Sequence, residues 1–137
     1  MIPESERHDF IASSLDDYIN YVFRSVKCFR NQNIFGARLE ASASIPSLLD
    51  VLFALHNRLW PFYGYLEKEL KAYPFKKLPW PADEFLKKIL LILSTADIKI
   101  QQEILKAMEK LSRREGFGKV FDDWKGKDKW AMTYRLK

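Results

Sequence analysis

Apolar residues recur every three or four positions along most of this chain, which is the spacing of amphipathic helices. The first run begins just after residue 10 and ends near residues 31–33. Its apolar positions are Ile11, Leu15, Ile19, Val22, Val26 and Phe29. Ser13 and Asp16 have the spacing of a helix cap at its start. The pattern therefore predicts a first helix, preceded by a flexible lead over residues 1–10.

A second helical pattern begins near Ile34 and contains Pro46 in its interior. Proline lacks the backbone N–H that a helical hydrogen bond needs, and its ring clashes with the preceding turn. We therefore expect the second helix to kink or restart near Pro46, with Ser44 capping the restarted part. The dipeptide Trp60-Pro61 ends this pattern.

Shorter apolar patterns predict the remaining helices. One covers about residues 63–73, one starts at Asp83 and a third starts at Asp97. Phe121 and Trp124 indicate one further helical turn that packs back on the body of the protein. Each pattern is bounded by proline, glycine or a capping aspartate, which are typical helix boundaries.

No segment alternates between apolar and polar residues for long enough to predict a β-strand. The sequence therefore predicts an all-α fold, a bundle of five to six mostly antiparallel helices. We expect a single helical domain over residues 1–137, and we expect its last residues, 125–137, to form a tail.

The composition fits a folded domain of ordinary size, because 47% of the 137 residues are hydrophobic and 15% are aromatic. The densest apolar run, Ile89–Leu93, is far shorter than the roughly 20 residues that span a bilayer. The first ten residues are polar and acidic, unlike a signal peptide. The single cysteine, Cys28, cannot form an internal disulfide, which is typical of a reducing compartment. We therefore expect a cytoplasmic protein with no membrane partner.

The net charge of +5 is spread unevenly along the chain. Residues 1–98 hold 12 Lys and Arg against 12 Asp and Glu, whereas residues 99–137 hold 11 against 6. The whole positive excess therefore lies in the last predicted helix and the tail. Such a surface can bind nucleic acid, nucleotide phosphates or an acidic protein, and it can equally be an ordinary solvated face.

Several common catalytic and cofactor motifs are missing from the sequence. It contains no P-loop, no glycine-rich dinucleotide fingerprint and no pair of cysteines. The two histidines, His8 and His56, lie far apart in the sequence, and the apolar helix face around His56 favours a structural role. Helical Glu–His combinations that bind metals are missing too, so the sequence predicts no metal site.

Three groups of side chains remain as candidate binding residues. They are Tyr21, Arg24, Ser25 and Lys27; Arg38 with Glu40; and Arg58 with Trp60, Phe62, Tyr63 and Tyr65. Cations beside hydroxyl groups or aromatic rings can bind phosphates and bases. Each group also has a structural alternative: a solvated helix face, an ion pair between helices, and an aromatic cluster that seals a turn.

The stretch from Ser14 to Pro74 resembles the helical substrate-binding region of bacterial and archaeal nucleotidyltransferases of the minimal and aminoglycoside-modifying type. In those proteins this region follows a small α/β catalytic domain. The resemblance is carried by Leu15, Asp16, Tyr18, Asn20, Arg24, Ser25, Lys27, Arg38, Leu39, Ala41, Ser44, Ile45, Pro46, Leu49, Phe53, Ala54, Leu55, Arg58, Pro61, Tyr65, Leu66, Glu69 and Leu70. The catalytic signature of the family, a Gly-Ser pair followed by metal-binding aspartates, does not occur in this sequence.

The resemblance implies that this chain is the helical half of a catalytic cleft. In that family the helical domain closes over the nucleotide and the acceptor, and in some members it supplies a general base. The residues that would bind nucleotide and substrate are Arg24, Lys27, Arg38, Arg58 and Tyr65. Glu40 would be the general base or would bind the acceptor's hydroxyl group.

The resemblance also implies the partners. The catalytic domain, fused or separate, would bring Mg²⁺ and the nucleoside triphosphate, and this chain alone would lack activity. The acceptor would be a small molecule or a protein, and the resemblance leaves a homodimer open.

Two alternatives remain open at the level of sequence. The first is a helical toxin-system component of the HEPN type, whose signature is an arginine followed about one helical turn later by a histidine. Neither His8 nor His56 has an arginine at that spacing before it. The second is a helical interaction module without enzymatic activity that uses its basic C-terminal half.

Overall fold

The computed structural model describes residues 3–136, and these residues contain helices and no strand. The all-α fold class predicted from the sequence is therefore confirmed. The elements in chain order are α1 (Glu4–Arg30), α2 (Ile34–Leu55), a 3₁₀ turn η1 (Tyr63–Tyr65), α3 (Leu66–Ala72), α4 (Ala82–Thr95), α5 (Ile98–Arg114), α6 (Gly118–Asp122) and α7 (Lys127–Thr133). The described part thus holds seven α-helices, one or two more than predicted, because α6 and α7 are too short to show a clear apolar period.

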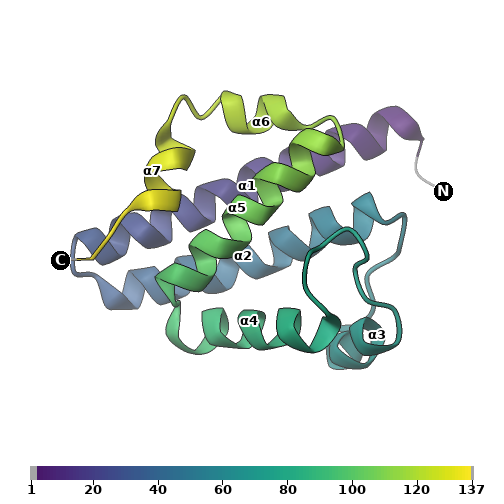
Figure 1. The fold of residues 1–137 in the computed structure, drawn as a ribbon, viewed down its shortest axis with the longest axis horizontal. Coiled ribbons are helices and arrows are strands. Elements are labelled where there is room, and N and C mark those ends of the chain that lie inside the picture. Colours follow the sequence, from purple (N-terminus) through teal and green to yellow (C-terminus); the bar gives the residue numbers. More distant parts are fainter. Residues whose placement is uncertain (1–2, 137) are drawn as a thin grey trace.

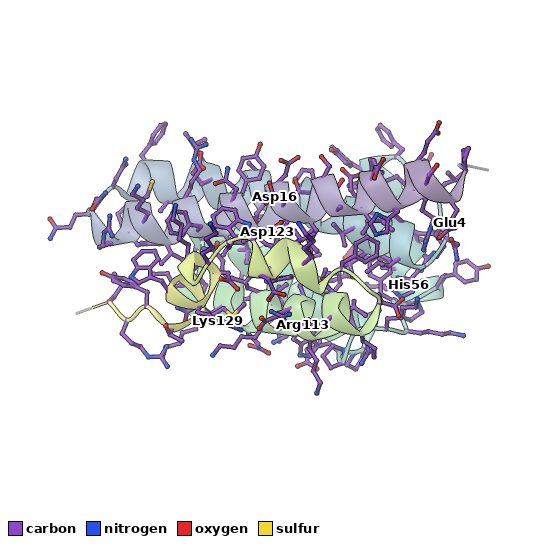
Figure 2. All side chains as sticks on the ribbon, turned by 90° about the horizontal axis from the view of Figure 1, so that it is seen from above. Glu4, Asp16, His56, Arg113, Asp123 and Lys129 are labelled. Carbon is purple, nitrogen blue, oxygen red and sulfur yellow. The ribbon has the colours of Figure 1, made fainter. Side chains whose placement is uncertain are left out.

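The two long helices α1 and α2 form an antiparallel hairpin, and α4 lies along α2 (Figure 1). Helix α5 lies over the hairpin on one side, in contact with α1 and α4, and α6 and α7 return the chain to α1 on that same side (Figure 2). The hairpin turn and the C-terminus lie at one end of the molecule, while α3 lies at the other end (Figure 1). Helices α1 and α2 thus form one pair and α4 and α5 form the other, because α5 contacts α1 and α4 while α4 also contacts α2.

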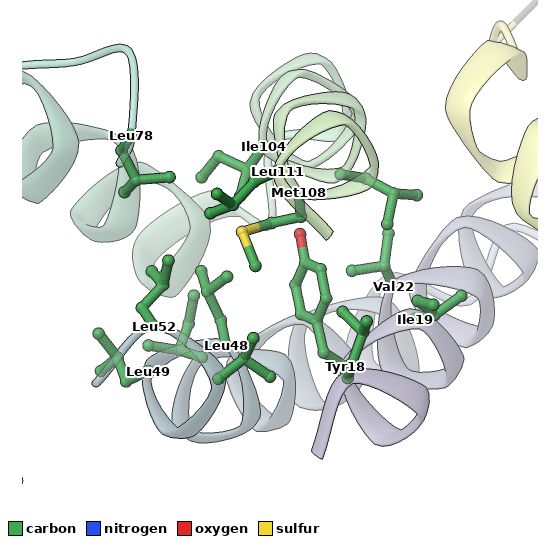
Figure 3. Close-up of a cluster of buried hydrophobic side chains, with 14 of the residues drawn as sticks. Tyr18, Ile19, Val22, Leu48, Leu49, Leu52, Leu78, Ile104, Met108 and Leu111 are labelled. Carbon is green, nitrogen blue, oxygen red and sulfur yellow. The ribbon is translucent and has the colours of Figure 1, made fainter. Parts of the chain in front are cut away.

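The core fills the space between the hairpin and α5 (Figure 3). Tyr18 and Val22 of α1 meet Leu48 and Leu52 of α2 beneath Met108 of α5, and all five side chains are buried. Burial also raises the pKa of the Tyr18 phenol well above its ordinary value, because the charged form would be desolvated. The apolar stripes that predicted the long helices are therefore the surfaces that pack together.

Helix α2 runs without interruption through Pro46, so the expected restart is absent from the structure. The Ser44 hydroxyl donates to the carbonyl of Ala41 at 2.6 Å instead of capping a new helix. Packing of the buried residues on both sides of Pro46 outweighs the missing backbone hydrogen bond. The kink remains a prediction.

Both chain ends differ from the sequence prediction. The expected lead over residues 1–10 is helical from Glu4 onward, and Arg7 donates from Nε and Nη2 to the carbonyl of Ala54 at 3.2 and 2.9 Å. The expected tail at 125–137 contains α7, whose Ala131 and Met132 are buried. Residues 1, 2 and 137 lie outside the described part. Contacts with distant residues order both ends, and such contacts leave no local pattern in the sequence.

None of the helices within residues 3–136 has both the length and the apolar character that crossing a bilayer requires.

Candidate functional site

Small side chains bring the two helices of the hairpin close together near its turn. Ala37 and Ala41 of α2 are fully buried against α1, and the Ser25 hydroxyl donates to the Ala37 carbonyl at 2.8 Å. The turn itself is closed by Asn33, whose side chain accepts from the backbone N–H of Gly36 at 2.9 Å. Ser25 therefore points into the interior, and it is separated from the exposed cations with which the sequence grouped it.

This close approach joins Arg24 of α1 to Glu40 of α2. Arg24 Nε lies 2.7 Å from Glu40 Oε2, and the glutamate side chain is mostly buried whereas the arginine is exposed. The contact is ionic without an aligned hydrogen bond, and no donor within residues 3–136 satisfies this buried oxygen. An acceptor oxygen of this kind is uncommon in native proteins, and because it is shielded from solvent a hydroxyl or amino group of a ligand can reach it only when the exposed Arg24 side chain moves aside.

The other two cations of this region point in different directions. Lys27 is exposed one turn further along α1, with its Nζ 5.8 Å from the centre of the Phe23 ring. Arg38 is exposed on α2 and makes no ion pair within residues 3–136. Residues two apart on a helix lie on different sides of it, so Arg38 does not share a face with Glu40. The sequence had grouped these two residues, and the structure separates them.

Arg58 and Tyr65 lie at the other end of α2. Arg58 donates to Glu69 of α3 at 2.8 Å, and its guanidinium lies 5.2 Å from the Phe53 ring and 5.3 Å from the Phe75 ring. Tyr65 is exposed, and its ring lies 5.9 Å from that of Phe62. The Arg58 side chain is therefore largely engaged in holding α3 and the loop after it against α2.

The predicted site residues thus divide into two groups. From Glu40 to the end of α2 at Leu55 the helix rises about 22 Å, at 1.5 Å per residue. One group, near the hairpin turn, contains Arg24, Lys27 and Glu40. The other group, beyond the C-terminal end of α2, contains Arg58 and Tyr65. The two groups are too far apart to contact the same phosphate group within this chain.

Two shallow depressions are present elsewhere on the surface. One is lined by Glu67, Lys68, Lys71 and Ala72 of α3, and the other by Lys99, Gln102, Glu103, Lys106 and Arg135. Neither contains a predicted site residue. Lys99 and Lys106 make no ion pair within residues 3–136. They are seven residues apart, about two helical turns, and this spacing in the sequence could have placed them on one face of α5. No three His, Cys, Asp or Glu side chains of the described part gather closely enough to hold a metal ion.

His56 has a structural position at the end of α2. Its Nδ1 donates to the carbonyl of Leu52 at 2.6 Å, and its Nε2 accepts from the backbone N–H of Lys77 at 3.2 Å. Partial burial lowers the pKa of His56 below 6.5, and the nearby Lys77 and Arg58 charges lower it further. Both ring nitrogens are therefore occupied in the neutral form, which favours the structural role expected from the sequence.

We expect His56 to make the protein less stable in mild acid. Its folded pKa is lower than its unfolded pKa, so the unfolded chain binds the proton first. The free energy of unfolding should therefore fall as the pH drops below about 6.5 and through the folded pKa. Urea unfolding at several pH values measures this, with His56→Asn and the matched exposed variant His8→Asn. A pH dependence that is the same in both variants would contradict the role of His56.

Comparison with family models, curated proteins and solved structures gave no match for this chain. The fold defines an all-α protein built on a long helical hairpin.

Proposed function

We propose that this chain is a helical substrate-binding module of the nucleotidyltransferase type, which acts with a catalytic domain that is fused to it or encoded separately. The observation that carries the proposal is the Arg24–Glu40 pair, in which a mostly buried carboxylate has an oxygen that accepts no hydrogen bond. The pair joins two helices within the stretch that resembles that family: Arg24 is one of the residues that carry the resemblance, and Glu40 follows the Arg38-Leu39 pair that also carries it.

The chemistry of the pair suits the proposal. Arg24 is exposed and offers N–H donors to a phosphate or to a carboxylate, and Lys27 adds a second cation one turn away. Once Arg24 turns toward the phosphate, the Glu40 carboxylate can accept a hydrogen bond from the hydroxyl or amino group of an acceptor. In the assembled enzyme Glu40 would take the proton that this group loses as it attacks the nucleotide. The catalytic domain would hold the Mg²⁺, which neutralises phosphate charge.

The separation of the site residues refines the proposal. Arg24, Lys27 and Glu40 form the ligand-facing end of this module. Arg58 is held by Glu69 and by two aromatic rings. It therefore positions the segment that carries Tyr65 and does not bind the nucleotide itself. A nucleotide bound at the hairpin end would not contact Arg58 of the same chain.

Isothermal titration of Mg-ATP tests the proposal, first into the full chain alone and then into its mixture with a minimal nucleotidyltransferase catalytic domain. We expect binding in the mixture, and we expect Arg24→Gln to weaken it about tenfold, because a charge-assisted contact of roughly 1.5–3 kcal/mol is lost. Glu40→Gln should also weaken Mg-ATP binding, because Arg24 loses the ion-pair partner that positions it, and it should lower the rate of nucleotide transfer to an aminoglycoside.

The matched control is Lys119→Gln, which removes an exposed cation of α6 that pairs with Asp123. This variant should bind Mg-ATP like the unmodified chain. The proposal fails if Mg-ATP does not bind alone or in the mixture. It also fails if Arg24→Gln and Lys119→Gln have the same effect.

A further inference from the structure

Every exposed side chain of α5 is charged, and all but one are basic. The basic residues are Lys99, Lys106, Lys110, Arg113 and Arg114, and the acidic residue is Glu103. Helix α5 crosses over the hairpin between α4 on one side and α6 and α7 on the other, and no helix among residues 3–136 covers its outer surface (Figure 1). Helix α5 therefore presents a strongly basic surface to solvent.

Three of these lysines form a straight row along the helix. At about 100° per residue, Lys99, Lys106 and Lys110 lie within about 40° of one another around the helix axis. The rise of about 1.5 Å per residue places Lys110 about 16 Å from Lys99 along that axis. Lys106 and Lys110 are four residues apart, where like charges repel each other. None of the three makes an ion pair within residues 3–136, so no acid of the described chain relieves this repulsion.

At the edge of the row toward α4, the charged side chains of α5 are already engaged. Glu103 Oε1 lies 2.6 Å from the Nζ of Lys88 on α4. Arg114 Nη2 donates to the carbonyl of Lys77, in the loop before α4, at 3.3 Å. The one exposed acid of α5 is therefore paired with a cation outside the row.

The acids at the opposite edge are engaged in the same way. Glu109 Oε2 lies 2.6 Å from Lys129 Nζ of α7 and 2.9 Å from Arg113 Nη2, and Asp122 of α6 also pairs with Arg113 at 2.9 Å. Arg113 and Lys129 are labelled in Figure 2. The acids on both edges thus neutralise other cations, and the lysine row between them keeps its full charge.

A fourth cation joins the row at a shallow depression. The depression is lined by Lys99, Gln102, Glu103, Lys106 and Arg135. Gln102 is buried, its Nε2 holds the end of α7 through two backbone carbonyls, and its Oε1 accepts from Arg135 Nη1 at 3.4 Å. This contact places the exposed Arg135 guanidinium beside the two lysines. Three cations around one hollow can bind a phosphate group.

We call the surface formed by Lys99, Lys106, Lys110 and Arg135 the basic α5 face. Its chemistry favours a nucleic-acid duplex over other anionic partners. Protein interfaces have an apolar centre and membrane-binding helices insert apolar side chains, whereas no apolar side chain of α5 is exposed. Single strands are bound by aromatic rings on which bases stack, and α5 contains no aromatic residue. A duplex requires neither, because it offers a rigid series of phosphates with one charge per roughly 1.7 Å of its axis.

We propose that the basic α5 face binds the phosphate backbone of double-stranded nucleic acid without reading its sequence. Lys99, Lys106 and Arg135 contact phosphate at the depression, and Lys110 contacts phosphate further along the duplex. Duplex DNA and duplex RNA share this chemistry, because the contacts involve phosphates alone. The inference is independent of the proposed function, whose nucleotide-binding residues lie on the α1–α2 hairpin.

Fluorescence anisotropy of the full chain with labelled duplexes of about 20 base pairs tests the proposal, with duplex DNA and duplex RNA in separate titrations. We expect binding that does not depend on sequence, with a dissociation constant of about 10⁻⁴–10⁻⁶ M. For duplex DNA, the logarithm of the association constant should fall against the logarithm of the salt concentration with a slope of about −3.6, because four phosphate contacts release counterions.

Two matched pairs of substitutions locate the binding surface. Lys106→Gln with Lys110→Gln should lower the affinity at least about tenfold at low salt, and it should reduce the size of the salt slope by about 1.8. Lys68→Gln with Lys87→Gln is the control, because it removes the same charge from exposed positions of α3 and α4. The control should leave the salt slope unchanged. Circular dichroism confirms that each protein keeps its helices.

Binding to either duplex with the expected slope, lost in the α5 variant and kept in the control, supports the proposal. Absence of binding to both duplexes at low salt overturns it. Equal loss of affinity in the two variants also overturns it, since the attraction would then come from net charge alone. Tighter binding to a single strand of the same length would assign the surface to unpaired bases. Binding to vesicles that contain phosphatidylserine, without binding to a duplex, would assign it to a membrane surface.

Discussion

Replacing Phe53 with alanine should lower the free energy of unfolding by about 3–5 kcal/mol, the usual cost of removing a buried aromatic side chain. Phe53 is fully buried in α2, and its ring lies 5.6 Å from that of Trp60 and 4.9 Å from that of Phe75. It also supports the guanidinium of Arg58. The cavity would therefore loosen the end of α2 together with the loop that follows it. Urea unfolding followed by circular dichroism measures the change.

Phe62→Ala is the matched control for this prediction. It removes the same ring from an exposed position in the loop before η1, and it should change the free energy of unfolding by only about 0.5 kcal/mol. Equal destabilisation by the two substitutions would contradict the arrangement of the core around Phe53.

Much of the fold could be predicted from the sequence, because α1, α4 and α5 have clear apolar periods and α2 is apolar over most of its length. The apolar surfaces of α1, α2, α4 and α5 meet in the core, and the predicted cap Asp97 lies where α5 begins. In these segments the residues that favour a helix locally are also the residues that the fold buries. A sequence pattern predicts structure well when local preference and tertiary packing agree in this way.

The ends of the chain could not be predicted in this way. The Trp124 indole N–H donates to Asp16 Oδ1 at 2.9 Å across 108 positions of sequence. Arg7 contacts the end of α2 across 47 positions. A lysine-rich segment such as α7 has no long apolar stripe, and its order depends on Gln102 of α5 donating to the carbonyls of Ala131 and Tyr134. Contacts between residues so far apart in the chain produce no regular spacing in the sequence, so they could not be predicted from it.

The candidate site shows the same division. An ion pair between helices was an open alternative for Arg38 and Glu40, and an ion pair does involve Glu40, but its partner is Arg24. Helical geometry alone separates residues two apart, so the placement of Arg38 away from Glu40 follows from the periodicity. The choice of Arg24 depends on the packing of α1 against α2. Similarly, the sequence identified Arg58 with its aromatic neighbours, while its partner Glu69 lies on α3.

Replacing Ala37 with leucine should disrupt both the hairpin and the proposed binding end. Ala37 is fully buried where α2 lies closest to α1, and its carbonyl accepts the Ser25 hydroxyl. A leucine there has no free volume, so the helices must move apart at a cost of about 1–3 kcal/mol. The same movement separates Arg24 from Glu40, which are now in contact at 2.7 Å.

Two measurements check this prediction together. Urea unfolding should show the loss of stability, and titration with Mg-ATP in the presence of the catalytic domain should show affinity reduced at least as much as by Arg24→Gln. Ala72→Leu, at an exposed position near the end of α3, is the control and should alter neither quantity. Lost stability with unchanged Mg-ATP affinity would mean that the spacing of Arg24 and Glu40 does not determine binding. The hairpin would then be a scaffold for a site formed elsewhere.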